Sequence, residues 1–146
     1  MPQLGPRVRA SLRIKNRLEE IDRLHLFWSG FADQACLAPE IRFKVELALE
    51  EAVANIVCHG FADDLGHEIA VELELSGGSM RIRLEDDGRP FNPLKAPPVD
   101  VDQLLEQRPI GGLGIHLMRS LMDRIRYRRI AGRNVLSLTK AVDRKE

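Results

Sequence analysis

Apolar and charged residues alternate along several segments of the chain. Strict alternation with a period of two is typical of β-strands that bury one face. It predicts strands at 7–14, 67–75, 81–86 and 123–130, with a last strand from the turn at 131–133 to about Val142. Gly77 and Gly78, between the second and third segments, predict a hairpin turn.

The segment 39–60 follows the helical period of 3.6 residues instead. Pro39 stands where a helix favours its first turn, and Gly60 stands where a helix favours its end. The apolar residues of this segment form a single stripe, as expected for a helix that packs on a sheet. They are Ile41, Val45, Ala48, Leu49, Ala52 and Ile56.

Two further helices are predicted on either side of this central one. The first extends from about Arg17 to Ala35, with Asn16 as its N-cap. Its expected apolar face comprises Leu18, Ile21, Leu24, Leu26 and Phe27. The second extends over 115–122, where apolar residues recur at helical spacing.

The strands carry arginine and glutamate on the side opposite their apolar residues. A sheet with one solvent-exposed and one buried face indicates that helices cover only one side of a mainly antiparallel sheet. The predicted fold class is therefore α/β, a two-layer α/β sandwich forming a single domain over residues 1–146. The arginine-rich stripe is interpreted as a solvated outer face, with cross-strand pairs to glutamate. A docking patch stays open as the alternative.

Composition restricts the classes of partner. The chain has 146 residues, with 22 basic and 22 acidic, so bulk charge gives no argument for binding nucleic acid or an anionic membrane. No apolar run approaches the ~20 residues of a membrane-spanning helix, and the N-terminus lacks the apolar core of a secretory signal. Cys36 and Cys58 lack metal-binding spacing and are expected to pack as reduced thiols on helices. We therefore expect a cytoplasmic protein.

Three polar residues of the central helix, Glu51, Asn55 and His59, are each four positions apart. This spacing stacks them along one edge of the apolar stripe. A carboxylate, an amide and an imidazole at the border of a buried face are candidates for chemistry. Hydrogen bonds to neighbouring elements would explain them equally well.

Strand parity separates Asp86 from the acidic residues beside it. Counted by twos from Ile82 and Leu84, its side chain points toward the helices. A buried carboxylate needs hydrogen-bond donors, because burying it unpaired is costly, and the amino group of adenine is one such donor. Gly88 would let the backbone approach a ligand closely. The alternative is an Asp-Asp-Gly turn in which Asp86 accepts bonds from local amides.

Residues 89–108 contain four prolines and few apolar residues, with at most a short helix at 101–107. A connection of this length in a small domain is usually functional, often a lid. It leads into IGGLG at 110–114, directly before the last predicted helix. Glycines at a helix start offer free N–H groups and the positive end of the helix dipole, which suit an anion. A flexible helix entry is the alternative.

The stretches EEAVANIVCHGF, EDDGRPFNP and RPIGGLGIHLMRSLMD occur in this order. They resemble the N, G1 and G2 boxes of the GHKL (Bergerat) nucleotide-binding fold. Within that superfamily, the closest likeness is to the anti-sigma-factor serine-protein kinases of bacteria, and it covers nearly the whole chain. The resemblance implies the cofactors ATP and Mg²⁺.

The resemblance also implies roles for single residues. Asn55 would give its amide oxygen to Mg²⁺, and Glu51 would be the general base that takes the proton of a serine hydroxyl. Asp86 would accept a hydrogen bond from the adenine amino group, with Gly88 beside the ring. His59 matches a histidine common in this group and has no assigned role.

The remaining implied contacts lie in and after the long connection. Residues 89–110 would form the ATP lid, and Arg108 is a candidate phosphate contact. Gly112, Leu113 and Gly114 would hold the phosphates. Pro90 stands where many relatives have the second glycine of DxGxG, and it stiffens the start of the lid because proline fixes φ.

The implied function is a protein serine kinase that binds a sigma factor and phosphorylates a STAS-type antagonist in a partner-switching system. The resemblance also suggests a homodimer. Because of Pro90, two alternatives remain open: a non-catalytic ATP-binding module that holds a protein partner, and a weak ATPase.

Overall fold

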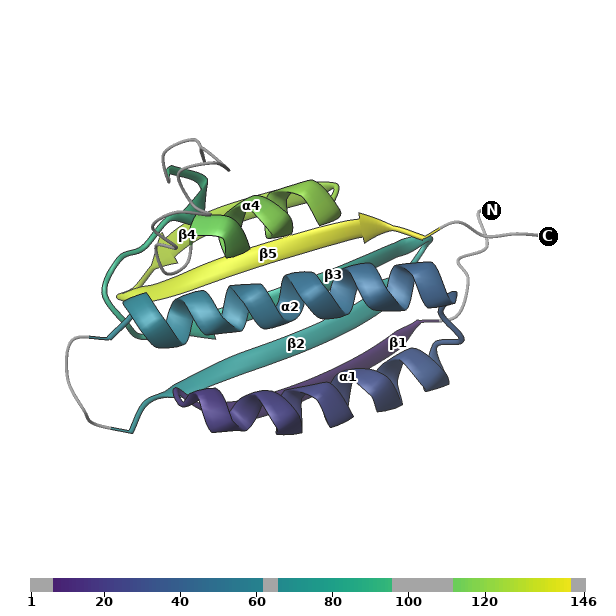
Figure 1. The fold of residues 1–146 in the computed structure, drawn as a ribbon, viewed down its shortest axis with the longest axis horizontal. Coiled ribbons are helices and arrows are strands. Elements are labelled where there is room, and N and C mark those ends of the chain that lie inside the picture. Colours follow the sequence, from purple (N-terminus) through teal and green to yellow (C-terminus); the bar gives the residue numbers. More distant parts are fainter. Residues whose placement is uncertain (1–6, 62–65, 96–111, 143–146) are drawn as a thin grey trace.

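The computed structural model describes residues 7–61, 66–95 and 112–142. Within these ranges, five strands form one antiparallel sheet in the order β1-β2-β3-β5-β4 (Figure 1). The strands are β1 (Val8–Lys15), β2 (Glu68–Ser76), β3 (Ser79–Asp86), β4 (Arg124–Ile130) and β5 (Arg133–Ala141). Gly77 and Gly78 turn β2 into β3 with φ of 58° and 80°, which confirms the predicted hairpin.

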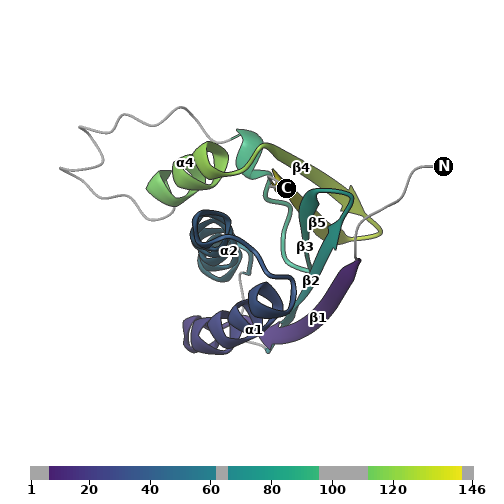
Figure 2. The same cartoon turned by 90° about the vertical axis from the view of Figure 1, so that its right-hand side faces the viewer.

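The helices cover one face of this sheet and leave the other bare, as Figure 2 shows. They are α1 (Ile21–Gln34), α2 (Pro39–His59) and α4 (Gly112–Leu121), with short 3₁₀ turns at Leu18–Glu20 and Pro93–Lys95. The α2 helix lies between α1 and α4. The predicted two-layer α/β sandwich is confirmed, and within the described ranges every strand pair is antiparallel.

The core forms where the stripe of α2 meets the inner face of the sheet. Val45, Ala48 and Leu49 are at most 1% exposed, and Ile41 at the start of the stripe is half-buried. The predicted inward residues of β2, β3 and β5 are buried against them. Since burial of an aliphatic side chain contributes roughly 1.5–3 kcal/mol, this contact fixes α2 over the middle of the sheet.

The outer face carries the predicted cross-strand ion pairs. Glu74 of β2 lies 2.7 Å from Arg7, and Glu72 lies 3.8 Å from Arg83 of β3. Exposed pairs of this kind contribute only ~0–1 kcal/mol each. They engage the glutamates of the outer face and contribute little to stability.

The start of α1 differs from the prediction. Asn16 does not cap the helix, because its Oδ1 accepts a hydrogen bond from the backbone N–H of His67 at 3.0 Å and so extends the pairing of β1 with β2. A 3₁₀ turn follows, and the α-helix begins only at Ile21. Leu18 and Leu26, expected on the apolar face, are 54% and 76% exposed, since the buried stripe runs instead through Leu24, Trp28, Phe31 and Ala32.

Both cysteines are free thiols, and Cys58 lies on α2, as expected, but both side chains are exposed and so do not pack in the core. Cys36 does not lie on a helix but follows α1, in a left-handed conformation with φ of 55°. In the part of the chain that the structure describes, no helix has the length and apolar character needed to cross a membrane. The short helix predicted at 101–107 lies outside the described residues.

Candidate functional site

Asp86 ends β3 with its side chain pointing into the helix layer, as its parity predicts, and is 2% exposed. Its Oδ1 accepts hydrogen bonds from the backbone N–H of Gly88 at 2.8 Å and from the Asn134 amide at 3.1 Å. Within the described ranges, Oδ2 has no hydrogen-bond partner. Burial raises the pKa of Asp86, although both hydrogen bonds act to lower it. One oxygen therefore closes the local turn, and the other is left for a further donor.

Asn134, which the sequence analysis did not identify, holds this carboxylate in place. It faces Asp86 in the register of β3 and β5 and is 6% exposed. Its Nδ2 also donates to the carbonyl oxygen of Arg89 at 2.9 Å. Its Oδ1 accepts from the hydroxyl of Tyr127 and from the guanidinium of Arg129, the latter at 3.1 Å. Counting by twos back from the apolar residues of β5 would have placed it on the inner face.

The turn after β3 lies directly against the C-terminal end of α2. A Cβ atom at Gly88 would stand 2.2 Å from the carbonyl oxygen of Gly60, so no larger residue fits without a backbone shift. The N–H of Arg89 donates to that same oxygen at 2.7 Å, and its Nε donates to the carbonyl oxygen of His59 at 2.9 Å. Gly88 was expected to make room for a ligand, but the space beside it is occupied by the carbonyl group of Gly60 at the end of α2.

Asn55 and Glu51 lie on the edge of α2 that the spacing predicts. Asn55 is 5% exposed, and its buried Nδ2 has no hydrogen-bond partner in the described part of the chain. A buried amide without a partner costs about 1–3 kcal/mol, so a bound ligand or water would stabilise this position. Glu51 is half-buried, and its pKa is raised by burial and, to a lesser extent, by the charge of Glu50. A carboxyl group with a raised pKa is suited to act as a general base.

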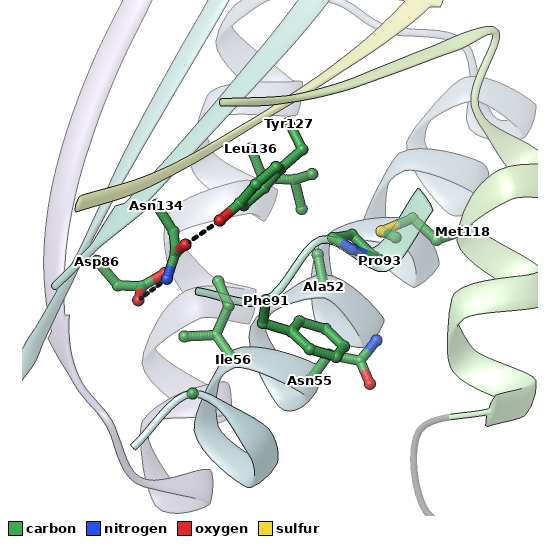
Figure 3. Close-up of a pocket in the computed structure, with 11 residues that line it drawn as sticks. Ala52, Asn55, Ile56, Asp86, Phe91, Pro93, Met118, Tyr127, Asn134 and Leu136 are labelled. Atoms are coloured by element: carbon green, nitrogen blue, oxygen red, sulfur yellow. Dashed lines mark hydrogen bonds between the residues drawn. The ribbon is translucent and has the colours of Figure 1, made fainter. Parts of the chain in front are cut away.

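Asp86, Asn134 and Asn55 line one pocket between α2, α4 and the ends of β3 and β5 (Figure 3), whereas Glu51 is not among its lining residues. Asp86, Asn134 and Tyr127 form its polar side, joined by the hydrogen bonds drawn in Figure 3. Asn55 and Phe91 also line the pocket. The other lining residues are mainly apolar: Ala52, Ile56, Gly60, Pro93, Met118 and Leu136. The pocket thus combines an apolar interior with few polar groups, as small-molecule sites do.

The pocket is nearly filled by its own side chains. Its free volume is about 20 Å³, which is room for about one water molecule. A purine ring therefore requires lining side chains to move. Phe91 lies in the segment that leaves β3, outside the strands, and its ring stacks on His59 with centroids 5.8 Å apart.

Comparison with known proteins identifies the family of this chain. A family model described as a histidine kinase-like ATPase domain matches residues 14–140. The chain belongs to this family. The GHKL resemblance expected from the three sequence boxes is thereby confirmed.

Curated relatives named serine-protein kinase RsbW match over almost the whole chain. The protein from Bacillus mycoides (strain KBAB4) is 30% identical over 139 residues, which cover 92% of this chain and 86% of the relative. The protein from Bacillus cereus (strain AH187) is 32% identical over the same shares. The chain is therefore a histidine kinase-like ATPase domain of the RsbW type.

A solved structure of the RsbU and RsbW domains from Mycobacterium tuberculosis has the same fold, with a TM-score of 0.63 and 18% identity. It covers 93% of this chain, which in turn spans 33% of that longer chain.

The structure brings together only part of the predicted histidine kinase-like site. Within the described residues, Asn55 and Asp86 line one pocket, and Gly88 adjoins it. The α4 helix begins at Gly112, so the second glycine cluster leads into a helix start as predicted. Arg108 and residues 96–111 of the expected lid lie outside the described residues. The contacts proposed for Arg108, Leu113 and Gly114 remain predictions.

Proposed function

We propose that this RsbW-type domain is an ATP-dependent protein serine kinase that binds a sigma factor and phosphorylates a STAS-type antagonist in a partner-switching system. The observation that supports this most is the placement of two hydrogen-bonding groups with spare capacity, Asp86 Oδ2 and the Asn55 amide, on opposite sides of one apolar pocket. Membership of the histidine kinase-like ATPase family and the likeness to RsbW serine-protein kinases support it independently.

Asp86 would select adenine, because its unpartnered oxygen accepts the hydrogen bond that the amino group of the ring donates. The carbons of Ile56, Met118 and Leu136 would enclose the faces of the ring. Asn134 and Gly88 hold the carboxylate in a fixed orientation, so binding would not require it to reorganise.

Asn55 fits a magnesium site. Mg²⁺ takes oxygen ligands, keeps several waters and is commonly held by one or two protein groups together with phosphate oxygens. The Asn55 amide has no hydrogen bond to break before it offers its oxygen, since it is unpartnered in the described residues. The metal, when bound, would neutralise charge on the transferred phosphoryl group.

Glu51 lies one helical turn before Asn55 on the same edge of α2. It would take the proton from the serine hydroxyl of the protein substrate as that oxygen attacks the terminal phosphorus. Burial favours the neutral carboxylic acid, so the carboxylate is more basic than an ordinary glutamate and suits this task.

The test is phosphoserine formation on a STAS-type antagonist from the same genome, measured with Mg-ATP by mass spectrometry. Glu51→Gln should reduce the rate about 10²-fold or more, because general base catalysis contributes on that scale. Glu50→Gln, measured at a pH above the acidic limb of the pH–rate profile, is the matched control: it removes the neighbouring carboxylate, which pairs with His25. The kinase proposal fails if no phosphoserine forms, or if Glu51→Gln phosphorylates as fast as Glu50→Gln.

A non-catalytic ATP-binding module that holds a protein partner is the second candidate. It is favoured by the segment that leaves β3, where Arg89 is tied to the end of α2 by two hydrogen bonds and the next residue is Pro90. These contacts restrain the part of the chain that would have to move as a lid. This candidate predicts nucleotide binding and partner capture that both survive Glu51→Gln, without phosphoserine or ATP hydrolysis. Phosphate release without phosphoserine would indicate the weak ATPase instead.

A further inference from the structure

The outer face of the sheet carries far more positive than negative charge. The strand register places nine basic and four acidic side chains on it. The basic residues are Arg9, Arg13, Lys15, Arg81, Arg83, Arg124, Arg126, Arg128 and Arg133, and the acidic ones are Glu68, Glu72, Glu74 and Glu85. The whole chain has equal numbers of both charges, so the positive excess is a property of this face.

The acidic residues of the face are already engaged by other basic groups. Glu68 and Glu74 pair with residues on the β1 side, Glu72 pairs with Arg83, and Glu85 pairs with Arg83 and Arg133. Four arginines of this face have no acidic partner among the described residues, and all four are exposed. We call these four the arginine patch: Arg81, Arg124, Arg126 and Arg128.

The arginine patch flanks β5 on both sides. Thr139 of β5 lies between Arg81 of β3 and Arg124 of β4 in the strand register. Ser137 lies next along β5, opposite Arg126. Strands two apart in a sheet are about 10 Å apart, and alternate residues of one strand are about 6.8 Å apart. Short hydroxyl side chains thus form a floor between two rows of long cationic ones.

We propose that the arginine patch is a docking surface for an acidic segment of a partner protein. An extended segment with a carboxylate at every second residue places these groups on one side at about 6.8 Å, the spacing of the arginines along β4. Planar guanidinium groups bind carboxylates in pairs of parallel hydrogen bonds. The serine and threonine hydroxyls of β5 add hydrogen-bonding groups to the floor.

Two other occupants fit the surface less well. Nucleic acid would find no aromatic side chain on the outer positions of β3, β4 and β5, so single strands have no stacking platform. A second copy of this chain docking through the same face would bring two positive surfaces together, and like charges across an interface are costly. The helices cover only the other face of the sheet (Figure 2), and the pocket lies between that face and α2 and α4, so the patch stands independently of the proposed catalysis.

The test uses the full chain and a fluorescein-labelled peptide of twelve residues that alternates Glu and Ser, with a Gln-Ser peptide as the neutral control. Fluorescence anisotropy at low and physiological salt measures the affinity. Arg126→Glu should weaken binding of the acidic peptide about tenfold, and Arg124→Glu/Arg126→Glu should weaken it further, because several charges act together. Raising the salt concentration should also weaken binding of the acidic peptide to the unsubstituted chain, because salt screens the charges.

Arg17→Glu is the matched control. Arg17 is also an exposed arginine without an ion pair in the described residues, but it lies beside α1, and the substitution changes the net charge equally. It should change the affinity less than about twofold, since its charge lies away from the patch. Arg126→Gln removes the charge without adding another, and it replaces Arg126→Glu in the test should that variant fold poorly. It should also weaken binding of the acidic peptide.

Several results would overturn the proposal. They are no binding of the acidic peptide at low salt, equal losses for the variants at positions 17 and 126, or tighter binding of a single-stranded oligonucleotide of matched charge. A change in oligomeric state of Arg124→Glu/Arg126→Glu in light scattering would assign the face to self-association instead. Nucleotide affinity, measured on the same variants, should not change, so a failure here is distinct from a failure of the nucleotide site.

Discussion

Replacing Asp86 by asparagine separates the two tasks of this buried carboxylate. Oδ1 accepts two hydrogen bonds from the protein, and an asparagine oxygen can accept both. The amide nitrogen then takes the place of Oδ2, which has no partner in the described part of the chain. The substitution therefore places a hydrogen-bond donor where Oδ2, the acceptor available to the adenine ring, stands in the unsubstituted protein. It keeps the local turn.

The substitution should affect stability and ATP affinity in opposite directions. Burial raises the pKa of Asp86, which means that the folded protein disfavours the charged form. Removing that charge should leave the thermal midpoint of the nucleotide-free protein unchanged or raised. A hydrogen bond to a charged group contributes about 1.5–3 kcal/mol, so ATP should bind about 10- to 100-fold more weakly.

The decisive assay is calorimetric titration with ATP and with ITP, whose base has an oxygen where adenine has its amino group. The unsubstituted protein should prefer ATP, and Asp86→Asn should lose or reverse this preference because its amide donates to that oxygen. The reasoning is refuted if the ratio of ATP to ITP affinity is the same in both proteins. A lowered thermal midpoint for Asp86→Asn would refute the argument from the buried charge.

Three other substitutions test the supporting geometry. Asn134→Ala removes a side chain that satisfies several buried groups, so it should cost about 2–4 kcal/mol in urea unfolding, and a loss under 1 kcal/mol would show that the network is dispensable. Gly88→Ala should lower both stability and nucleotide affinity, whereas Gly66→Ala, with nothing within 4 Å of the added Cβ and an exposed backbone, should be neutral in both. Glu50→Gln removes a like charge that helps raise the pKa of Glu51, so the acidic limb of the pH–rate profile should move to lower pH; an unmoved or upward-shifted limb would contradict the assignment of the base.

The sequence predicted the parts of this structure that depend on period and parity. Alternation identified each strand, and the apolar stripe of α2 identified the face that packs on the sheet. Parity alone placed Asp86 inside, because a strand has only two faces. The same argument applied to β5 would have found Asn134, but the stretch that begins at Arg133 follows a turn, where the start of the strand is hard to locate in sequence.

The remaining features depend on contacts between segments far apart in the chain. Asn16 has the side chain of an N-cap, yet its oxygen bonds to His67, 51 residues away, which no local pattern shows. The need for glycine at position 88 arises from the carbonyl oxygen of Gly60, a contact created only when the end of α2 meets the end of β3. Leu26 has helical spacing but points to solvent, because α1 packs through Leu24 and Trp28.

The central claim is that Asn55 and Asp86 bind one magnesium-bound adenine nucleotide, and calorimetric titration of Asn55→Ala tests it most directly. In the unsubstituted protein, removal of Mg²⁺ with EDTA should weaken ATP binding. In Asn55→Ala, ATP should bind about as weakly with Mg²⁺ as without it, because the protein ligand for the metal is lost. Unchanged, magnesium-dependent affinity in Asn55→Ala would contradict the account.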